Sequence, residues 1–183
     1  YRALQPARYG GLELDYGAQT MFARELGRAC ASSAWVGGIL ACHGWMAGML
    51  PDEAQAEIWG DNADVAVSTS FLPIGVQVER KGDILNISGR WRFSSGVDHC
   101  RWAIVLVIVP PENGEGPPDP VFAMIDLNDC VIEATWNSAG LAGTGSNDIV
   151  VASADIPPHR MMRVMGLRGE ETAGSKANSS YLY

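Results

Sequence analysis

The stretch Trp91-Arg92-Phe93-Ser94-Ser95-Gly96-Val97-Asp98-His99-Cys100-Arg101-Trp102 joins a predicted β-hairpin to the most apolar run of the chain. It brings together aromatic side chains, two adjacent hydroxyls, a glycine and a histidine. Such a turn can lay a serine hydroxyl against a flat polar ring while aromatic side chains wall that ring in. An ordinary strand–turn–strand with core aromatics accounts for the same residues. On these residues alone, both interpretations remain open.

Strand patterns with a period of two lie on both sides of this stretch. Before it, residues 65–71 alternate between apolar and polar side chains, and Lys81-Gly82-Asp83 separates two short β-type runs, which predicts a hairpin. After it, residues 103–109 form an unbroken apolar run, typical of a strand buried on both faces. Further strands are predicted at residues 121–125, 130–136 and 149–152, with exposed or flexible loops at 110–120 and 140–146.

The N-terminal third of the chain carries helical patterns instead. Asp15 is a good N-cap for a helix over residues 16–30. Ser32 or Ser33 is expected to cap a second helix. Pro51, followed by two acidic residues, predicts the start of a third helix, since proline fits the first turn and acids suit the dipole.

Composition narrows the class of protein. The 183 residues carry a formal net charge of −8 with no run of Lys or Arg, which argues against nucleic acid or an anionic membrane as a partner. Residues 31–50 lack formal charge, but glycines, serines and a histidine dilute their hydrophobicity, so we predict a buried helix and no membrane span. The four cysteines form no C-x-x-C pair, which favours reduced thiols in a cytoplasmic protein and predicts no metal centre.

Helices followed by strands indicate an α+β fold, and the motifs resemble the acyl-CoA dehydrogenase superfamily. Pro6-Ala7-Arg8-Tyr9-Gly10-Gly11-Leu12 and Leu26-Gly27-Arg28-Ala29 are similar to its N-terminal helical part. Residues 91–96 and 140–148 resemble the oxygenase components of two-component flavin-dependent monooxygenases of the p-hydroxyphenylacetate hydroxylase type. Ser68-Thr69-Ser70-Phe71-Leu72-Pro73 stands where dehydrogenases usually carry Thr-Glu-Pro, which favours the monooxygenase branch.

The resemblance implies three regions. Residues 1–62 would be a partial N-terminal helical domain, and residues 63–165 a middle, β-barrel-like domain. Residues 166–183 would be a linker toward a C-terminal helical bundle that is missing from this sequence. Because that bundle builds a tetramer in the family, a homotetramer is expected.

The branch also implies an activity. The protein would take reduced FMN or FAD from a separate flavin reductase, react it with O2 to a C4a-hydroperoxyflavin, and hydroxylate a small aromatic or polycyclic substrate. One alternative is an acyl-CoA dehydrogenase, in which a carboxylate abstracts the α-proton. The other is a non-catalytic flavin-fold binding subunit.

Site residues follow from the same resemblance. Ser94 is expected to face flavin N5 and His43 to stabilise a substrate phenolate, as the two catalytic residues. His43 on an apolar helix stripe is equally compatible with mere packing. The expected flavin-binding residues are Ser70, Phe71, Trp91, Phe93, Ser94 and Ser95, and the expected substrate-binding residues are His43, Thr144 and Ser146.

Overall fold

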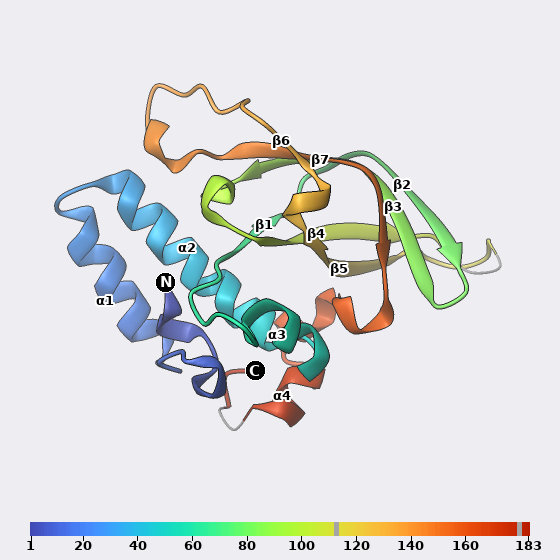
Figure 1. Ribbon diagram of the computed structural model, residues 1–183, viewed down its shortest axis with the longest axis horizontal. Helices are drawn as coiled ribbons and strands as arrows, with labels where there is room; N and C mark the ends of the chain where they lie inside the picture. Colours follow the sequence, from blue (N-terminus) through green and yellow to red (C-terminus); the bar gives the residue numbers. More distant parts are fainter. Residues whose placement is uncertain (112–113, 179–180) are drawn as a thin grey trace.

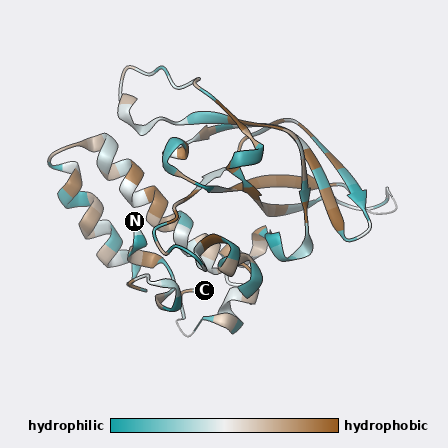
Figure 2. Cartoon of the chain, viewed as in Figure 1, coloured by the Kyte–Doolittle hydropathy of each residue, from teal (hydrophilic) through white to brown (hydrophobic). Residues whose placement is uncertain are grey.

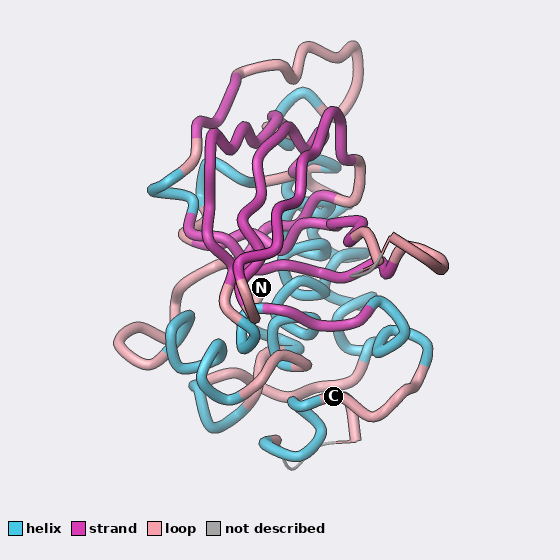
Figure 3. The backbone as a smooth tube through the Cα atoms, turned by 90° about the vertical axis from the view of Figure 1, so that its right-hand side faces the viewer, coloured by secondary structure: helices cyan, strands magenta, loops and turns pink. Residues whose placement is uncertain are grey.

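A computed structural model describes residues 1–111, 114–178 and 181–183 of the chain. Three of the four α-helices precede the strands along the chain, in agreement with the α+β prediction, and the helices gather on one side of the strands (Figure 1). Turned by 90°, the strands form one block and the helices lie beside and behind it rather than around it (Figure 3). In the described ranges, no helix has the length and apolar character needed to cross a bilayer.

The described part of the chain contains four α-helices, eight strands and seven short 3-10 helices. The α-helices are α1 (Tyr16–Gly27), α2 (Ala31–Gly48), α3 (Asp52–Trp59) and α4 (Ala173–Ala177). The strands are β1 (Val67–Ser70), β2 (Pro73–Lys81), β3 (Ile84–Ser94), β4 (Trp102–Val109), β5 (Asp119–Asp126), β6 (Val131–Glu133), β7 (Asn147–Ile156) and β8 (Met161–Arg163). The 3-10 helices are η1 (Arg2–Leu4), η2 (Ala7–Tyr9), η3 (Val97–His99), η4 (Leu127–Asp129), η5 (Ala142–Thr144), η6 (Pro158–Arg160) and η7 (Val164–Arg168).

The strands form two four-stranded sheets, in the orders β1-β4-β5-β8 and β2-β3-β7-β6. The predicted hairpin is present as β2 and β3, and β1 pairs with β4 in parallel. The expectation of a β-barrel-like domain is corrected here, because no strand pair among the described residues joins the two sheets into a closed barrel. The sheets instead pack face to face.

Buried apolar side chains from both sheets fill the space between them. Trp91 and Ile149 come from one sheet and Val105 and Ile125 from the other, and each is at most 1 % exposed. Hydrophobic residues accordingly cluster in the central strands (Figure 2). The apolar run predicted at 103–109 is β4, and its pairing with both β1 and β5 places it inside its sheet.

Helix α2 lies between the rest of the helical layer and β1. The apolar stripe on which His43 was expected to lie is buried in the C-terminal half of α2, at Leu40, His43 and Ala47. The Asp15 cap is confirmed, because its carboxylate accepts from the Ala18 N–H at 2.8 Å. The predicted Ser32 or Ser33 cap is wrong: α2 begins at Ala31, and no side chain caps it.

Residues 166–183 fold back onto the helices in their described part. The Tyr183 hydroxyl donates to the Leu4 carbonyl at 2.7 Å, and the Asn178 amide donates to the Gly48 carbonyl at 2.7 Å. The assignment of this segment as a linker stays a prediction, as do the domain boundaries. Residues 112–113 of the expected loop at 110–120, and residues 179–180 of the expected linker, lie outside the described residues.

Candidate active site

A cavity of about 310 Å³ opens where α2, the end of β1 and the end of β3 meet. Its walls are mostly apolar and aromatic, with a few polar side chains among them. Helix α2 contributes Trp35, Ile39, Cys42, His43 and Met46; the end of β1 and the residues after it contribute Thr69, Ser70, Phe71 and Leu72; β3 and its exit contribute Arg92, Phe93 and Ser95.

A β-bulge at the end of β3 sets which side chains reach the cavity. The pairing of β3 with β7 shifts between Trp91 and Ser94, and Phe93 lies in the left-handed region at φ 61°. Residues two apart on a regular strand share a face, but a bulge breaks this alternation. As a result Trp91 is fully buried, whereas Phe93 is 42 % exposed and lines the cavity.

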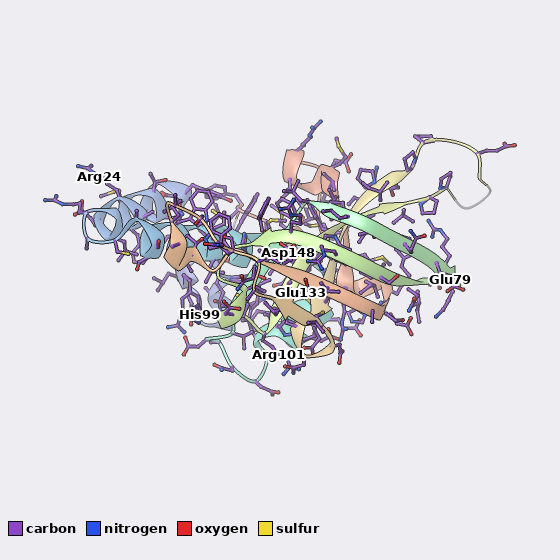
Figure 4. All side chains as sticks on the ribbon, turned by 90° about the horizontal axis from the view of Figure 1, so that it is seen from above. Arg24, Glu79, His99, Arg101, Glu133 and Asp148 are labelled. Atoms are coloured by element: carbon purple, nitrogen blue, oxygen red, sulfur yellow. The ribbon has the colours of Figure 1, made fainter. Side chains whose placement is uncertain are left out.

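Asp148 on β7 stabilises this bulge through hydrogen bonds. Its carboxylate accepts from the Phe93 N–H at 3.3 Å and from Arg90 Nη1 at 3.0 Å, while its side chain is only 4 % exposed. Arg90 also bonds Glu133 on β6 at 2.6 Å, which places Asp148 and Glu133 beside each other (Figure 4). A buried carboxylate therefore compensates the strained backbone that turns the Phe93 ring outward.

The bulge also separates the two adjacent serines. Ser94 is fully buried. Its hydroxyl lies within donating distance of two acceptors, Ser68 Oγ at 3.0 Å and the Thr69 carbonyl oxygen at 3.2 Å. Ser94 does not line the cavity, and the expectation that its hydroxyl faces a flavin stays a prediction. Of these two adjacent serines, Ser95 is the one on the cavity wall.

Ser95 begins a chain of hydroxyls that leads away from the cavity. Trp35 Nε1 donates to Ser95 Oγ at 3.0 Å. Ser95 Oγ bonds Ser146 Oγ at 2.8 Å, and Ser146 Oγ bonds Thr144 Oγ1 at 2.7 Å. Ser146 and Thr144 are 4 % and 2 % exposed and lie behind the wall, not on it. Their expected direct contact with substrate stays a prediction.

His43 lies on the cavity wall as a neutral base. Its Nδ1 lies 3.1 Å from the Val67 carbonyl, which only accepts, so Nδ1 carries the ring proton. Its Nε2 then accepts from the Thr69 hydroxyl at 2.8 Å. Burial lowers the pKa of His43 to about 4, since desolvation disfavours the imidazolium. The ring is therefore uncharged at neutral pH and is held in one tautomer.

The remaining predicted site residues divide between the cavity and the core. Ser70 and Phe71 line the cavity; the Ser70 hydroxyl donates to the Arg92 carbonyl, and the Phe71 ring packs 5.0 Å from that of Phe122. Trp91 is not a cavity wall: its indole donates to the Leu106 carbonyl at 2.7 Å between the sheets. Trp91 thus holds a core position, and its expected flavin contact stays a prediction.

Several cavity residues are not among the expected site residues. Trp35, Ile39, Cys42 and Met46 recur at spacings of three and four, a second stripe on α2 that the sequence does display. Thr69 belongs to the alternating run 65–71, but nothing in that run pairs it with a histidine. Burial raises the pKa of the Cys42 thiol, which keeps this wall residue protonated and neutral.

The residues present fit a flat, partly polar aromatic group. Phe71, Phe93 and Trp35 offer ring faces and edges, while the Ser95 hydroxyl offers one polar contact on a mostly apolar wall. Among the described residues that line the cavity, none is an Asp or Glu. Mostly apolar walls with a few hydroxyls, Arg92 and the neutral base His43 suit the binding of a redox-active ring beside a small substrate.

Comparison with known proteins gives the class. No family model matches the chain. The whole chain nevertheless aligns with oxygenase components of flavin-dependent monooxygenases, and it is a homologue of these enzymes. The solved structures that it matches share an acyl-CoA dehydrogenase-like fold.

Three relatives illustrate the similarity to these oxygenase components. The chain is 33 % identical over 173 residues to the "FADH(2)-dependent resorcinol hydroxylase, oxygenase component" of Rhizobium sp. (strain MTP-10005), covering 94 % of this chain and 42 % of that protein. It is 35 % identical to the flavin-dependent monooxygenase oxygenase subunit HsaA of Rhodococcus jostii (strain RHA1), covering 100 % of this chain and 47 % of HsaA.

The crystal structure of the HsaA monooxygenase from M. tuberculosis superposes with a TM-score of 0.92 at 30 % identity. That match covers 100 % of this chain and 47 % of the crystallised one. The chain therefore spans about half the length of the relatives that it matches.

Proposed function

We propose that the protein carrying this chain is the oxygenase component of a flavin-dependent monooxygenase. It would take reduced FAD or FMN from a separate reductase and use O2 to hydroxylate a small aromatic substrate. The observation that carries the proposal is the cavity, in which aromatic walls, the Ser95 hydroxyl and the neutral His43 meet in a homologue of such oxygenases.

The flavin, when bound, supplies the activation of oxygen and the transfer of one oxygen atom. The residues of this chain would bind and orient the flavin ring and exclude water from it. Ser95 rather than Ser94 is our candidate for the hydroxyl that meets flavin N5, because only Ser95 lines the cavity. Phe71 and Phe93 would pack against the ring.

His43 and Thr69 would receive the hydroxyl of a phenolic substrate. His43 Nε2 holds the Thr69 proton, and Thr69 Oγ1 keeps lone pairs that can accept from an incoming hydroxyl. A phenol that donates to this pair shifts electron density onto its ring and becomes more nucleophilic. The low pKa of His43 supports this role, because an imidazolium would have no free lone pair to accept with.

The test is single-turnover hydroxylation by the full-length protein. Dithionite-reduced FAD, a panel of phenols and ¹⁸O2 are mixed, and the product is analysed by mass spectrometry. We expect one ¹⁸O atom in the product, and a rate reduced about 10²-fold or more in His43→Ala. Release of hydrogen peroxide alone, without a hydroxylated product from any phenol, would argue against a hydroxylase.

The dehydrogenase alternative predicts a different signal. Acyl-CoA added to the protein with oxidised FAD would bleach the flavin anaerobically, without a reductase. The non-catalytic alternative predicts flavin binding with neither bleaching nor product. We expect neither of these results.

We extend the proposal to a cytoplasmic homotetramer. Exposed apolar side chains on α1 and before it, among them Met21, Phe22 and Leu12, support an interface on this side. Light scattering of the full-length protein after gel filtration tests the tetramer, and a monomer at micromolar concentration would contradict it.

A further inference from the structure

We propose that Ser146 is a positioning residue that makes the cavity bind reduced flavin more tightly than oxidised flavin. It does so by accepting the Ser95 proton, which leaves the Ser95 oxygen free to accept from flavin N5–H. This inference rests on the proposed function, because it requires a flavin in the cavity beside Ser95.

The first step is the position of the hydroxyls. Ser95 lines the cavity, whereas Ser146 and Thr144 are buried directly behind it. The Ser95–Ser146 and Ser146–Thr144 oxygen distances are 2.8 Å and 2.7 Å, so the three hydroxyls form one continuous chain. Trp35 Nε1 adds a fixed donor to Ser95 at 3.0 Å.

The second step is a count of protons and lone pairs. A serine hydroxyl has one proton and two lone pairs, and an indole N–H only donates. Trp35 therefore occupies one lone pair of Ser95 in every state. Of the second lone pair and the proton of Ser95, one faces Ser146 and the other faces the cavity.

The third step is that the hydrogen bonds along these three hydroxyls can run in either of two directions. When Ser95 donates to Ser146, and Ser146 to Thr144, a Ser95 lone pair faces the cavity. When the chain runs the other way, the Ser95 proton faces the cavity. Flavin N5 donates a hydrogen bond in the reduced form and accepts one in the oxidised form, so each direction matches one redox state.

The two redox states do not need Ser146 equally. Toward oxidised flavin, Ser95 can give its proton to N5 itself and needs no second acceptor. Toward reduced flavin, Ser95 accepts from N5–H, and its own proton must go elsewhere in a buried site. Ser146 is the acceptor that the structure provides, and a buried donor without an acceptor costs free energy.

The test compares flavin binding in both redox states. Ser146→Ala in the full-length protein is titrated with oxidised FAD, and with dithionite-reduced FAD under anaerobic conditions. We expect the Kd for reduced FAD to rise about tenfold, while the Kd for oxidised FAD changes less than twofold. The midpoint potential of the bound flavin then falls by about 30 mV for this two-electron couple.

Three further variants make the result specific. Thr144→Val keeps the side-chain shape but removes the last of the three hydroxyls. We expect a smaller rise in the Kd for reduced FAD, and this variant also tests the inference if Ser146→Ala folds poorly. Ser146→Thr keeps the hydroxyl and should bind FAD as the wild type does. Ser94→Ala removes the adjacent hydroxyl that faces away from the cavity, and it should leave the ratio of the two Kd values unchanged.

Equal weakening of both redox states in Ser146→Ala and Thr144→Val would overturn the inference while leaving the proposed function intact. A shift in the ratio for Ser94→Ala as large as that for Ser146→Ala would overturn it too. Wild-type protein that binds FAD in neither redox state would overturn both this inference and the proposed function.

Discussion

His43 is an uncharged base whose two ring nitrogens are both engaged. The Val67 carbonyl fixes the proton on Nδ1, and the Thr69 hydroxyl occupies Nε2. Each partner belongs to β1, so the strand that lines the cavity also determines the tautomer of the histidine. Replacing His43 would therefore remove two contacts with β1 and also alter the cavity wall.

The first prediction concerns pH. The pKa of His43 is about 4 in the folded chain, whereas an unfolded histidine titrates near 6.5. Between these values the unfolded chain binds a proton that the native chain does not, so the free energy of unfolding falls as pH decreases through 6.5. From pH 7 to pH 5 the loss should be about 2 kcal/mol.

Urea unfolding at both pH values measures this loss. In His43→Gln the other titrating groups remain, so the difference between wild type and variant isolates His43. We expect the variant to lose less stability than the wild type between pH 7 and pH 5. An identical loss in both proteins would contradict a depressed pKa.

Phe93 gives a prediction about backbone strain. At φ 61° a side chain with a Cβ costs on the order of 1 kcal/mol relative to glycine. Phe93→Gly should therefore be more stable than Phe93→Ala by about 1 kcal/mol, the reverse of the usual order inside a strand. Urea unfolding of the two variants measures this difference, and an Ala variant equal to or better than Gly would contradict the left-handed conformation.

At the scale of elements, the decisive feature is the bulge in β3. Leu85, Ile87 and Trp91 are buried on one face of the strand, although its pairing with β7 also shifts between Ile87 and Gly89. The shift after Trp91 turns Phe93 outward and Ser94 inward, and it delivers Ser95 to the cavity. Asp148 on the neighbouring strand β7 stabilises this arrangement through the Phe93 N–H.

Removing the Asp148 carboxylate should relax the bulge. Asp148→Ala leaves the Phe93 N–H without its acceptor and deprives Arg90 of one partner. Because Arg90 is about one-third exposed, solvent weakens its ion pair, and we expect the free energy of unfolding to fall by about 2 kcal/mol. Asp148→Asn keeps an acceptor oxygen and should lose about half as much. Chemical unfolding of both variants measures the losses, and equal losses would show that the N–H contact does not matter.

The same bulge explains which parts of the site the sequence could predict. Residue types and strand alternation are sufficient for the β2–β3 hairpin, the apolar β4 and the helix α1 with its Asp15 cap. Alternation also places Trp91 and Phe93 on one face, which is wrong here. A bulge depends on tertiary partners such as Asp148, so the exchange between Ser94 and Ser95 was not visible in the local pattern.

At the scale of the whole molecule, the helical layer is closed by the C-terminal residues. The Gly174 N–H donates to the Met49 carbonyl at 2.9 Å, where α4 meets the end of α2. A Cβ at Gly174 would lie 1.9 Å from the Gly48 carbonyl oxygen and 2.5 Å from Met49 Cα, both backbone atoms. This approach leaves no room for any other residue.

Gly174→Ala should therefore detach α4 from α2 without disturbing the sheets. Hydrogen exchange followed by mass spectrometry should show faster exchange in residues 172–178, and unchanged exchange in the strands. Gly140→Ala is the matched control, because a Cβ at Gly140 meets nothing within 4 Å. Equal exchange in residues 172–178 of the two variants would contradict the close approach.

The cavity is assembled from three stretches of chain, one on α2, one from Thr69 to Leu72 and one ending at Ser95. Because these stretches come together only when the chain folds, a molecule that fills the cavity binds the folded chain and not the unfolded one. At a concentration one hundred times its Kd, such a molecule adds about 2.7 kcal/mol to the free energy of unfolding. Thermal melting of the protein in the presence of candidate phenols is thus a way to find its substrate before any turnover has been observed.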